Sequence, residues 1–158
     1  MSTYLVLKWF HILCSVLMVG TGFGSAFYMF FINRTQSVEA QALVSRLVVR
    51  ADWWFTTPTV ILQPLSGLAL AHLAGWPLES SWIVCALMLY ALAGLCWLPV
   101  VALQLRMAAM AERAWQDGTP LPEAYHRHAR LWTWLGIPAF TAMLAVYYLM
   151  VAKPVLWN

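Results

Sequence analysis

Long apolar runs separated by polar connections dominate this chain. The first run, Trp9 to Ile32, has 24 residues with no charged side chain and a single histidine, His11. As a helix with a rise of 1.5 Å per residue it would be about 36 Å long, which is enough to cross a hydrocarbon core of about 30 Å with some tilt. Together with three later runs it predicts helices over residues 4–32, 53–76, 82–105 and 131–152. The pattern therefore predicts an all-α membrane protein: a four-transmembrane-helix bundle that forms one integral membrane domain over residues 1–158.

The polar connection at residues 33–52 has a helical pattern of its own. Its apolar side chains recur at near-helical spacing, at Ala40, Leu43, Val44, Leu47 and Val48. This spacing predicts a short helix. Two placements fit it: an interfacial helix lying at the membrane surface, or an extension of the second span into the cytoplasm.

Composition excludes several classes of protein. Hydrophobic residues make up 63% of the chain and charged residues 9%, whereas a soluble domain carries about 25% charged residues. The net charge of +3 lies on the connections beside the membrane and does not indicate binding to nucleic acid. The sequence has no phosphate-binding loop, HExxH motif, paired carboxylates or nucleophilic triad, which disfavours a hydrolase. The three cysteines lie in apolar runs without CxxC spacing, so no disulfide framework is indicated.

The basic residues predict the orientation. Seven of the nine flank the two long connections, and the other two, Lys8 and Lys153, lie near the opposite surface. By the positive-inside rule both long connections are cytoplasmic and both termini periplasmic, in a bacterial inner membrane. The seven are Arg34, Arg46, Arg50, Arg106, Arg113, Arg127 and Arg130.

Two histidines are the first candidates for chemistry. Counting along the helices places His11 about 10 Å and His72 about 6 Å below the outer surface, on adjacent antiparallel spans. An ionisable residue inside a membrane is a functional-site hypothesis, and two imidazoles can hold haem iron or another transition metal. Ser15 or a carbonyl freed near Pro64 could support the ring of His11, and Gly67 is predicted to lie beside the cofactor. The alternatives are that each histidine hydrogen-bonds a neighbouring helix, or that both line a proton or substrate path.

Sulfur-containing side chains at similar depth allow a second metal. Cys14, Met18 and Cys85 could join His11 and His72 around copper, because soft thiol and thioether ligands suit Cu(I) and imidazole suits either metal. The sequence therefore predicts haem iron at His11 and His72, with copper as the alternative.

Three segments resemble a known group of proteins. KWFHILCSVLMVGTGF, which contains His11, resembles the first helix of the HemJ-type protoporphyrinogen oxidases; TTPTVILQPLSGLALA, from Thr56 to Ala71, resembles their second helix, and LMVAKPV their C-terminus. The chain as a whole resembles a family of predicted bacterial integral membrane proteins of unknown function, related to HemJ-type proteins and to CopD-like copper-resistance proteins. The resemblance implies that His11 is a ligand of b-type haem.

One departure from the HemJ pattern changes the expected activity. HemJ-type proteins carry a lysine early in the third helix, in a W-x-x-x-K context, whereas here Trp82 is followed by Ile83, Val84, Cys85 and Ala86. Protoporphyrinogen oxidation is therefore not the expected reaction, and the catalytic residues stay unknown. His72 would be the second axial ligand.

Three functions follow from these observations. The leading interpretation is a membrane protein that binds haem b and takes part in electron transfer or a membrane redox reaction, as an oxidoreductase related to HemJ-type proteins. The second is a copper-handling membrane protein, and the third is a cofactor-free structural membrane subunit. The expected partners are the lipid bilayer, a redox partner protein and a second copy of the chain in a homo-oligomer.

Overall fold

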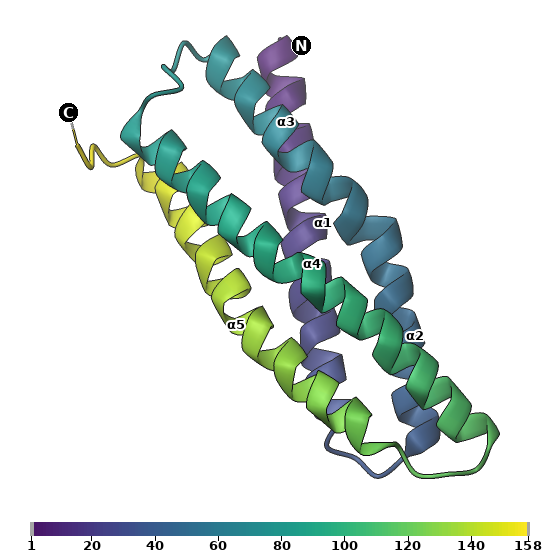
Figure 1. Ribbon diagram of the computed structural model, residues 1–158. Helices are drawn as coiled ribbons and strands as arrows, with labels where there is room; N and C mark the ends of the chain where they lie inside the picture. Colours follow the sequence, from purple (N-terminus) through teal and green to yellow (C-terminus); the bar gives the residue numbers. More distant parts are fainter. Residues whose placement is uncertain (1, 158) are drawn as a thin grey trace.

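Within residues 2–157, which the computed structural model describes, the chain forms four long helical rods and no strand. The first rod is α1 (Thr3–Ile32), the third is α4 (Ser81–Gln116) and the fourth is α5 (Glu123–Ala152). The second rod runs without a break through α2 (Val38–Ala51), the π-helical segment η1 (Asp52–Thr56) and α3 (Thr57–Leu73), as Figure 1 shows. The predicted all-helical fold is confirmed for the described residues.

Local sequence explains where the rods end. Ser2 caps α1, because its side chain accepts a hydrogen bond from the backbone N–H of Leu5. α3 ends before Gly75, whose φ of +72° is a left-handed conformation that glycine adopts without strain. α4 ends in the same way before Gly118, with φ of +62°. α3 therefore ends at Leu73, earlier than the predicted end of the second apolar helix at residue 76.

The π-helical turn follows from a proline. Pro58 has no backbone N–H, and in a regular α-helix its ring would clash with the carbonyl group of Trp54. The turn before it is wider: the backbone N–H of Thr57 donates to the carbonyl oxygen of Asp52. Single π-helical turns of this kind occur frequently at functional sites.

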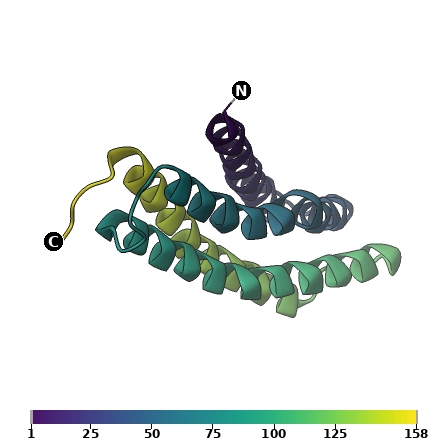
Figure 2. The ribbon, with the colours of Figure 1, turned by 90° about the horizontal axis from the view of Figure 1, so that it is seen from above.

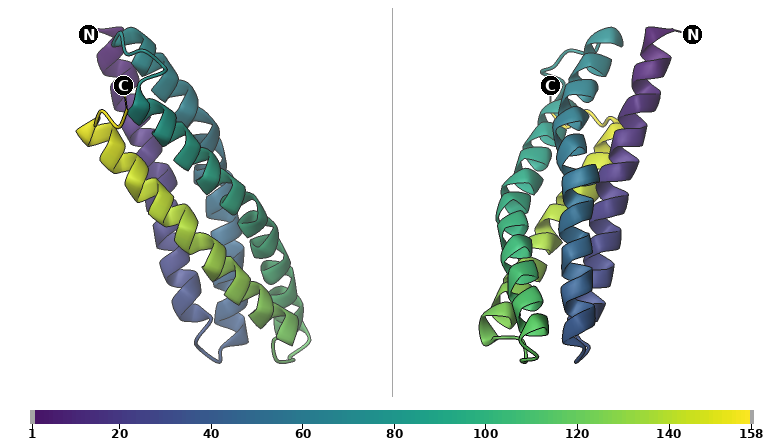
Figure 3. Two further views of the ribbon diagram at one scale, coloured as in Figure 1. Left: turned by 60° about the vertical axis from the view of Figure 1, so that its left-hand side comes forward. Right: turned by 90° about the vertical axis from the view of Figure 1, so that its right-hand side faces the viewer.

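The four rods associate as two pairs. α1 packs along α3, and α4 packs along α5, whereas α1 and α5 make few contacts (Figure 3). α2 joins the pairs by packing against α4 at the end of the bundle that carries the connections 33–37 and 117–122. We call this the arginine end, because all seven arginines of the chain flank it. Seen from above, α1 stands apart from the layer that α4 and α5 form (Figure 2).

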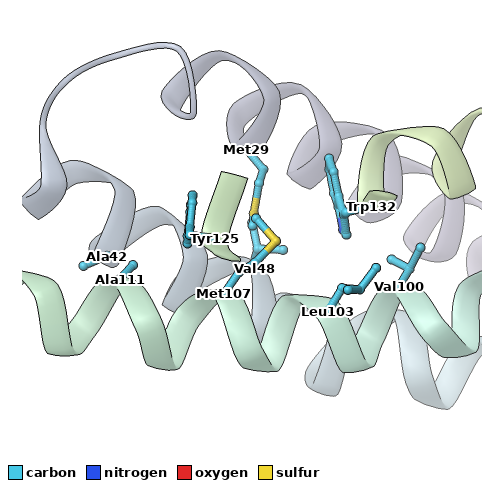
Figure 4. Close-up of a cluster of buried hydrophobic side chains, with 9 residues drawn as sticks. All are labelled: Met29, Ala42, Val48, Val100, Leu103, Met107, Ala111, Tyr125 and Trp132. Atoms are coloured by element: carbon cyan, nitrogen blue, oxygen red, sulfur yellow. The ribbon is translucent and has the colours of Figure 1, made fainter. Parts of the chain in front are cut away.

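The largest buried hydrophobic cluster lies toward the arginine end. In Figure 4 the side chains of Met29 on α1 and Met107 on α4 point toward one another, and both are 0% exposed. Tyr125 is also fully buried, and its hydroxyl donates to Asn33 Oδ1 at 2.6 Å. The other members of the cluster are Ala42, Val48, Val100, Leu103, Ala111 and Trp132.

α2 belongs to this core. Its buried residues, Gln41, Ala42, Ser45 and Val48, lie on one face of the helix, and α2 packs against α4 and α1. α2 continues the axis of α3, as the alternative of an extended second helix predicts. Ala42 and Val48 are buried against protein, whereas Leu43 and Leu47 are exposed, and the interfacial placement is not confirmed.

Three of the helices are long and apolar enough to cross a membrane by length and composition: α1, α4 and α5. α3 has 17 residues and is not one of the three. Large hydrophobic side chains on the outside of all these helices are exposed, including Trp9, Leu65, Leu95 and Tyr148. An apolar exterior of this kind suits lipid as the surrounding solvent.

Candidate functional site

His11 lies at the interface between α1 and α3. Its Nδ1 is 2.8 Å from Ser66 Oγ, and its Nε2 is 3.1 Å from Gln63 Nε2. The ring is partly buried, and both of its nitrogen atoms are engaged by the same neighbouring helix. The imidazole therefore connects the two helices of the first pair.

The hydrogen bonds assign the tautomer of His11. Ser66 Oγ also lies 2.7 Å from the carbonyl oxygen of Leu62, to which it donates its single hydroxyl proton. Nδ1 must then be the donor to Ser66, and Nε2 accepts from the amide of Gln63. His11 is thus a neutral imidazole with its hydrogen-bonding capacity satisfied, as a buried polar ring inside a membrane protein requires.

Gly67 makes this approach possible. A Cβ atom at Gly67 would lie 3.1 Å from Cε1 of His11, closer than ordinary van der Waals contact. Glycine therefore lets the imidazole lie against the backbone of α3. Of the four predicted cofactor-binding residues, the structure brings together His11 and Gly67.

The other two predicted residues lie elsewhere. His72 follows Ser66 by six positions on α3, which is about 9 Å along the helix axis, and its side chain is exposed. The structure does not pair it with His11. Ser15 is buried, but its hydroxyl donates to the carbonyl oxygen of Ile12 at 2.8 Å. The partner of His11 Nδ1 is the hydroxyl of Ser66, not that of Ser15.

The predicted copper ligands are distributed over both helix pairs. Cys14 is buried on α1, whereas Cys85 on α4 packs beside Ala86, Val146 and Leu149. Within residues 2–157, no group of three or more His, Cys, Asp or Glu side chains gathers in a way that could hold a metal ion.

A large cavity lies between the two helix pairs. It has a volume of about 450 Å³, within the usual range of small-molecule sites, and all four rods contribute to its wall. We call it the chamber. Some residues of each rod line it, and they are spaced along four stretches: 18–31 of α1, 52–60 of the second rod, 90–104 of α4 and 132–143 of α5.

Aromatic side chains form much of the chamber wall. Five phenylalanines, two tryptophans and a tyrosine line it: Phe23, Phe27, Phe30, Phe31, Phe140, Trp97, Trp132 and Tyr90. Glycines 22, 94 and 136 also line it, and a Cβ atom added at any of them would meet nothing within 4 Å. Small residues where the helices face the cavity therefore leave the space open.

Polar side chains gather at the part of the chamber nearest the arginine end. Asp52 is 5% exposed and accepts a hydrogen bond from Thr56 Oγ1 at 2.8 Å. Burial raises the pKa of the Asp52 carboxyl group above its usual value, and hydrogen bonds from Thr56 and Gln104 oppose this shift. Asp52, Thr56 and Gln104 form a polar floor, and Asp52 is the one chamber-lining residue with a formally charged side chain.

Three side chains of the chamber wall carry a buried polar atom without a partner in the described part of the chain. Oε1 of Gln104 and Nε1 of Trp97 and of Trp132 have no hydrogen-bond partner, and Gln104 and Trp132 are 3% and 7% exposed. A buried polar atom that forms no hydrogen bond costs about 1–3 kcal/mol. Unpaired buried groups of this kind are uncommon in native proteins and call for a structural or functional explanation.

Two aromatic rings of the chamber wall stack between α1 and α5. The rings of Phe23 and Phe140 stack there with centroids 5.3 Å apart, and both side chains line the chamber. The side chain of Phe23 is 56% exposed on the outer surface of the bundle.

Sequence reasoning missed the polar floor. Asp52 was assigned to the polar connection, and Gln104 to the end of an apolar run, so nothing connected the two. The sequence does mark both residues as unusual. Asp52 immediately precedes the second apolar run, and Gln104 is an amide inside the third apolar run. Linking them requires the packing of the second rod against α4.

Comparison with known proteins identifies a family. Residues 5–154 match the family described as "Predicted integral membrane protein (DUF2269)", which covers nearly the whole chain. The chain belongs to this family of predicted integral membrane proteins. No curated protein and no solved structure matches the chain. The membrane family predicted from the sequence is confirmed, and its relationship to HemJ-type and CopD-like proteins stays a prediction.

Proposed function

We propose that this chain is a four-span protein of a bacterial inner membrane that binds an apolar small molecule inside the chamber. The observation that carries the proposal is the cavity of about 450 Å³, with aromatic walls and a polar floor. Ligand sites are concave, mostly apolar and equipped with a few polar groups that orient the ligand. The chamber has each of these properties.

α3 would be the fourth span. It packs along α1, one of the three candidate spans, and its outward side chains Ile61, Leu65 and Leu68 are exposed. A polar helix in that place would be expected if α3 lay in water. With four spans, both termini would lie on one side, and by the positive-inside rule the seven arginines at the arginine end support a periplasmic location for that side.

The chamber would take its ligand from the bilayer. Phe23 and Phe140 stack in the chamber wall on the side where α1 and α5 make few contacts. Separation of these two stacked rings would open a path between the helices without breaking a hydrogen bond. The ligand would therefore be soluble in lipid.

Haem b stays the cofactor that the family resemblance predicts, and the residues described above do not fit a haem held by His11 and His72. Both ring nitrogens of His11 are engaged by α3, and no histidine is among the residues that line the chamber within the described chain. The predicted copper ligands are not gathered at one site either, since Cys14 and Cys85 lie on different helix pairs. An absorption spectrum of protein purified from haem-supplemented cells decides: a Soret band would support haem, and metal analysis would detect copper.

Two matched glycine substitutions test the chamber. Gly22 lines it, whereas Gly20, one turn or less away on the same helix, does not, and a Cβ at either position meets nothing within 4 Å. The neutral fluorophore N-phenyl-1-naphthylamine should bind purified protein in dodecylmaltoside at one saturable site. Gly22→Leu should remove this site because the leucine side chain occupies the chamber, and Gly20→Leu should retain it.

The same pair shows when the proposal fails. Fluorescence that does not saturate, or that is equal for wild type and Gly22→Leu, would mean that the probe dissolves only in the micelle. Adding Gly136→Leu, from the opposite wall on α5, should abolish any binding that remains in Gly22→Leu. Because all three positions are open, helix formation itself should not suffer from leucine, which is a better helix former than glycine.

A further inference from the structure

We infer that the chamber selects a lipid-soluble organic cation, an ammonium group on an apolar body, and that this group binds at Asp52 and Gln104. The inference rests on the proposed chamber and specifies the chemistry of its ligand. Three observations carry it: an unpaired buried carboxyl group, an unpartnered carbonyl oxygen beside it, and walls rich in aromatic rings.

The carboxyl group of Asp52 lacks a cationic partner. In the described part of the chain the one ion pair joins Arg46 and Glu112, which are 3.2 Å apart at the surface. Asp52 receives its hydrogen bonds from a hydroxyl and an amide only. A buried carboxylate is costly unless a positive charge compensates it, so a cation in the chamber would be held by the strongest interaction available there.

Gln104 supplies a second acceptor. Its Oε1 is buried and has no partner, and its side chain hydrogen-bonds Asp52. An ammonium group has N–H donors and no acceptor, so it can satisfy a carboxylate and an amide oxygen at once. An anionic headgroup would instead place like charges together at the floor, because no chamber-lining residue is basic.

The aromatic walls suit the same ligand. Trp97 and Trp132 line the chamber together with Gln104, and tryptophan has the ring face that attracts cations most strongly. Phenylalanine rings toward the opening would contact the apolar body of the ligand. Charge, hydrogen-bond acceptors and ring faces thus favour one class of compound over neutral and acidic molecules of the same shape.

Three probes with one apolar body test the selectivity. 4-Phenylbutylammonium, 4-phenylbutanol and 5-phenylpentanoate each carry a phenyl ring on four methylene groups, and they differ only in a cationic, neutral or anionic head. Each would compete with N-phenyl-1-naphthylamine for the wild-type protein in dodecylmaltoside. We expect the ammonium compound to displace the fluorophore at about tenfold lower concentration than the alcohol, as one charge-assisted hydrogen bond allows, and the carboxylate to be weakest.

An isosteric variant locates the charge. Asp52→Asn should remove the tenfold preference for ammonium while it still binds the fluorophore and the alcohol. Glu39→Gln is the matched control, since it removes the same charge from an exposed position on α2 and should keep the wild-type order. Fluorophore binding by each variant shows directly that its chamber is intact.

Each outcome decides between the two proposals. Equal displacement by ammonium and alcohol, or tighter binding of the carboxylate, in wild-type protein would overturn cation selectivity and leave the chamber in place. Loss of selectivity in Glu39→Gln as well as in Asp52→Asn would also overturn it, because the effect would be one of overall charge. If the fluorophore has no saturable site in wild-type protein, the chamber itself fails as a binding site and the cation proposal falls with it.

Discussion

The contact between His11 and Gly67 makes a quantitative prediction about stability. A methyl group in Gly67→Ala would lie 3.1 Å from Cε1 of His11. Cε1 is the ring atom between Nδ1 and Nε2, and both nitrogens hydrogen-bond to α3, the helix that carries Gly67. Movement of the ring away from the new methyl group therefore lengthens both hydrogen bonds, so the substitution cannot be accommodated without loss.

The expected magnitude combines three terms. Replacing glycine by alanine in a helix is favourable by about 1 kcal/mol. Overpacking costs about 1–3 kcal/mol, and each weakened hydrogen bond forfeits part of its roughly 0.5–1.5 kcal/mol. We expect Gly67→Ala to lower the free energy of unfolding by about 1–2 kcal/mol. In a His11→Ala background the ring is absent, so the same substitution should raise it by about 1 kcal/mol.

Reversible unfolding of the detergent-solubilised protein by sodium dodecyl sulfate, followed by circular dichroism, measures these differences. Gly94→Ala is the control, because a Cβ at Gly94 meets nothing within 4 Å and should be neutral or stabilising. The reasoning would be refuted if Gly67→Ala had the same effect with and without His11. It would equally fail if Gly67→Ala were as stable as wild type, since the ring would then move freely.

Three further predictions concern other parts of the molecule. Asp52→Asn should be more stable than wild type at neutral pH and equal to it near the usual carboxyl pKa of 3.8. Because the pKa of Asp52 is raised in the folded state, the wild-type protein loses stability as the pH rises above that value. A pH-independent difference between the two proteins in the unfolding titration would contradict this. Tyr125→Phe should cost about 1–3 kcal/mol in the same unfolding assay, because Asn33 Oδ1 loses the donor that lies 2.6 Å away, and an unchanged midpoint would show that water replaces it. A C-terminal alkaline phosphatase fusion should be active and a fluorescent-protein fusion exported through the Sec pathway should stay dark, and the reverse pattern would place the arginine end outside the cell.

Local features of the sequence were enough to predict the helices. Apolar runs of membrane-spanning length predicted α1, α4 and α5, and the glycines that end α3 and α4 act on their own neighbours in the chain. Helix formation depends on interactions between residues three to five apart, so a linear pattern contains the information needed. The same pattern left open whether residues 38–51 lie on the membrane or extend the second span, since one amphipathic face suits lipid and protein alike.

The partners of His11 were decided by tertiary structure. The sequence indicated that an imidazole inside a span needs a partner, and depth counting proposed His72. Ser66 and Gln63 are 55 and 52 residues away in the chain. Counting along a helix estimates depth to within about one turn, 5.4 Å, but leaves undetermined which face of α3 meets α1 and how far the two helices are shifted along each other. Both quantities come from side-chain packing, and Gly67 contributes to it.

The chamber depended on tertiary structure entirely. Its residues come from all four rods, and its volume is the space left when α1 pairs with α3 and α4 pairs with α5. Composition determined that the interior would be aromatic and apolar, because the long apolar runs that form the helices are rich in aromatic residues. The meeting of Asp52 and Gln104 at one floor required α2, which continues into η1, to pack against α4 in a single register. Contacts between distant segments arise from the shapes of complementary surfaces, which the order of residues along one helix does not specify.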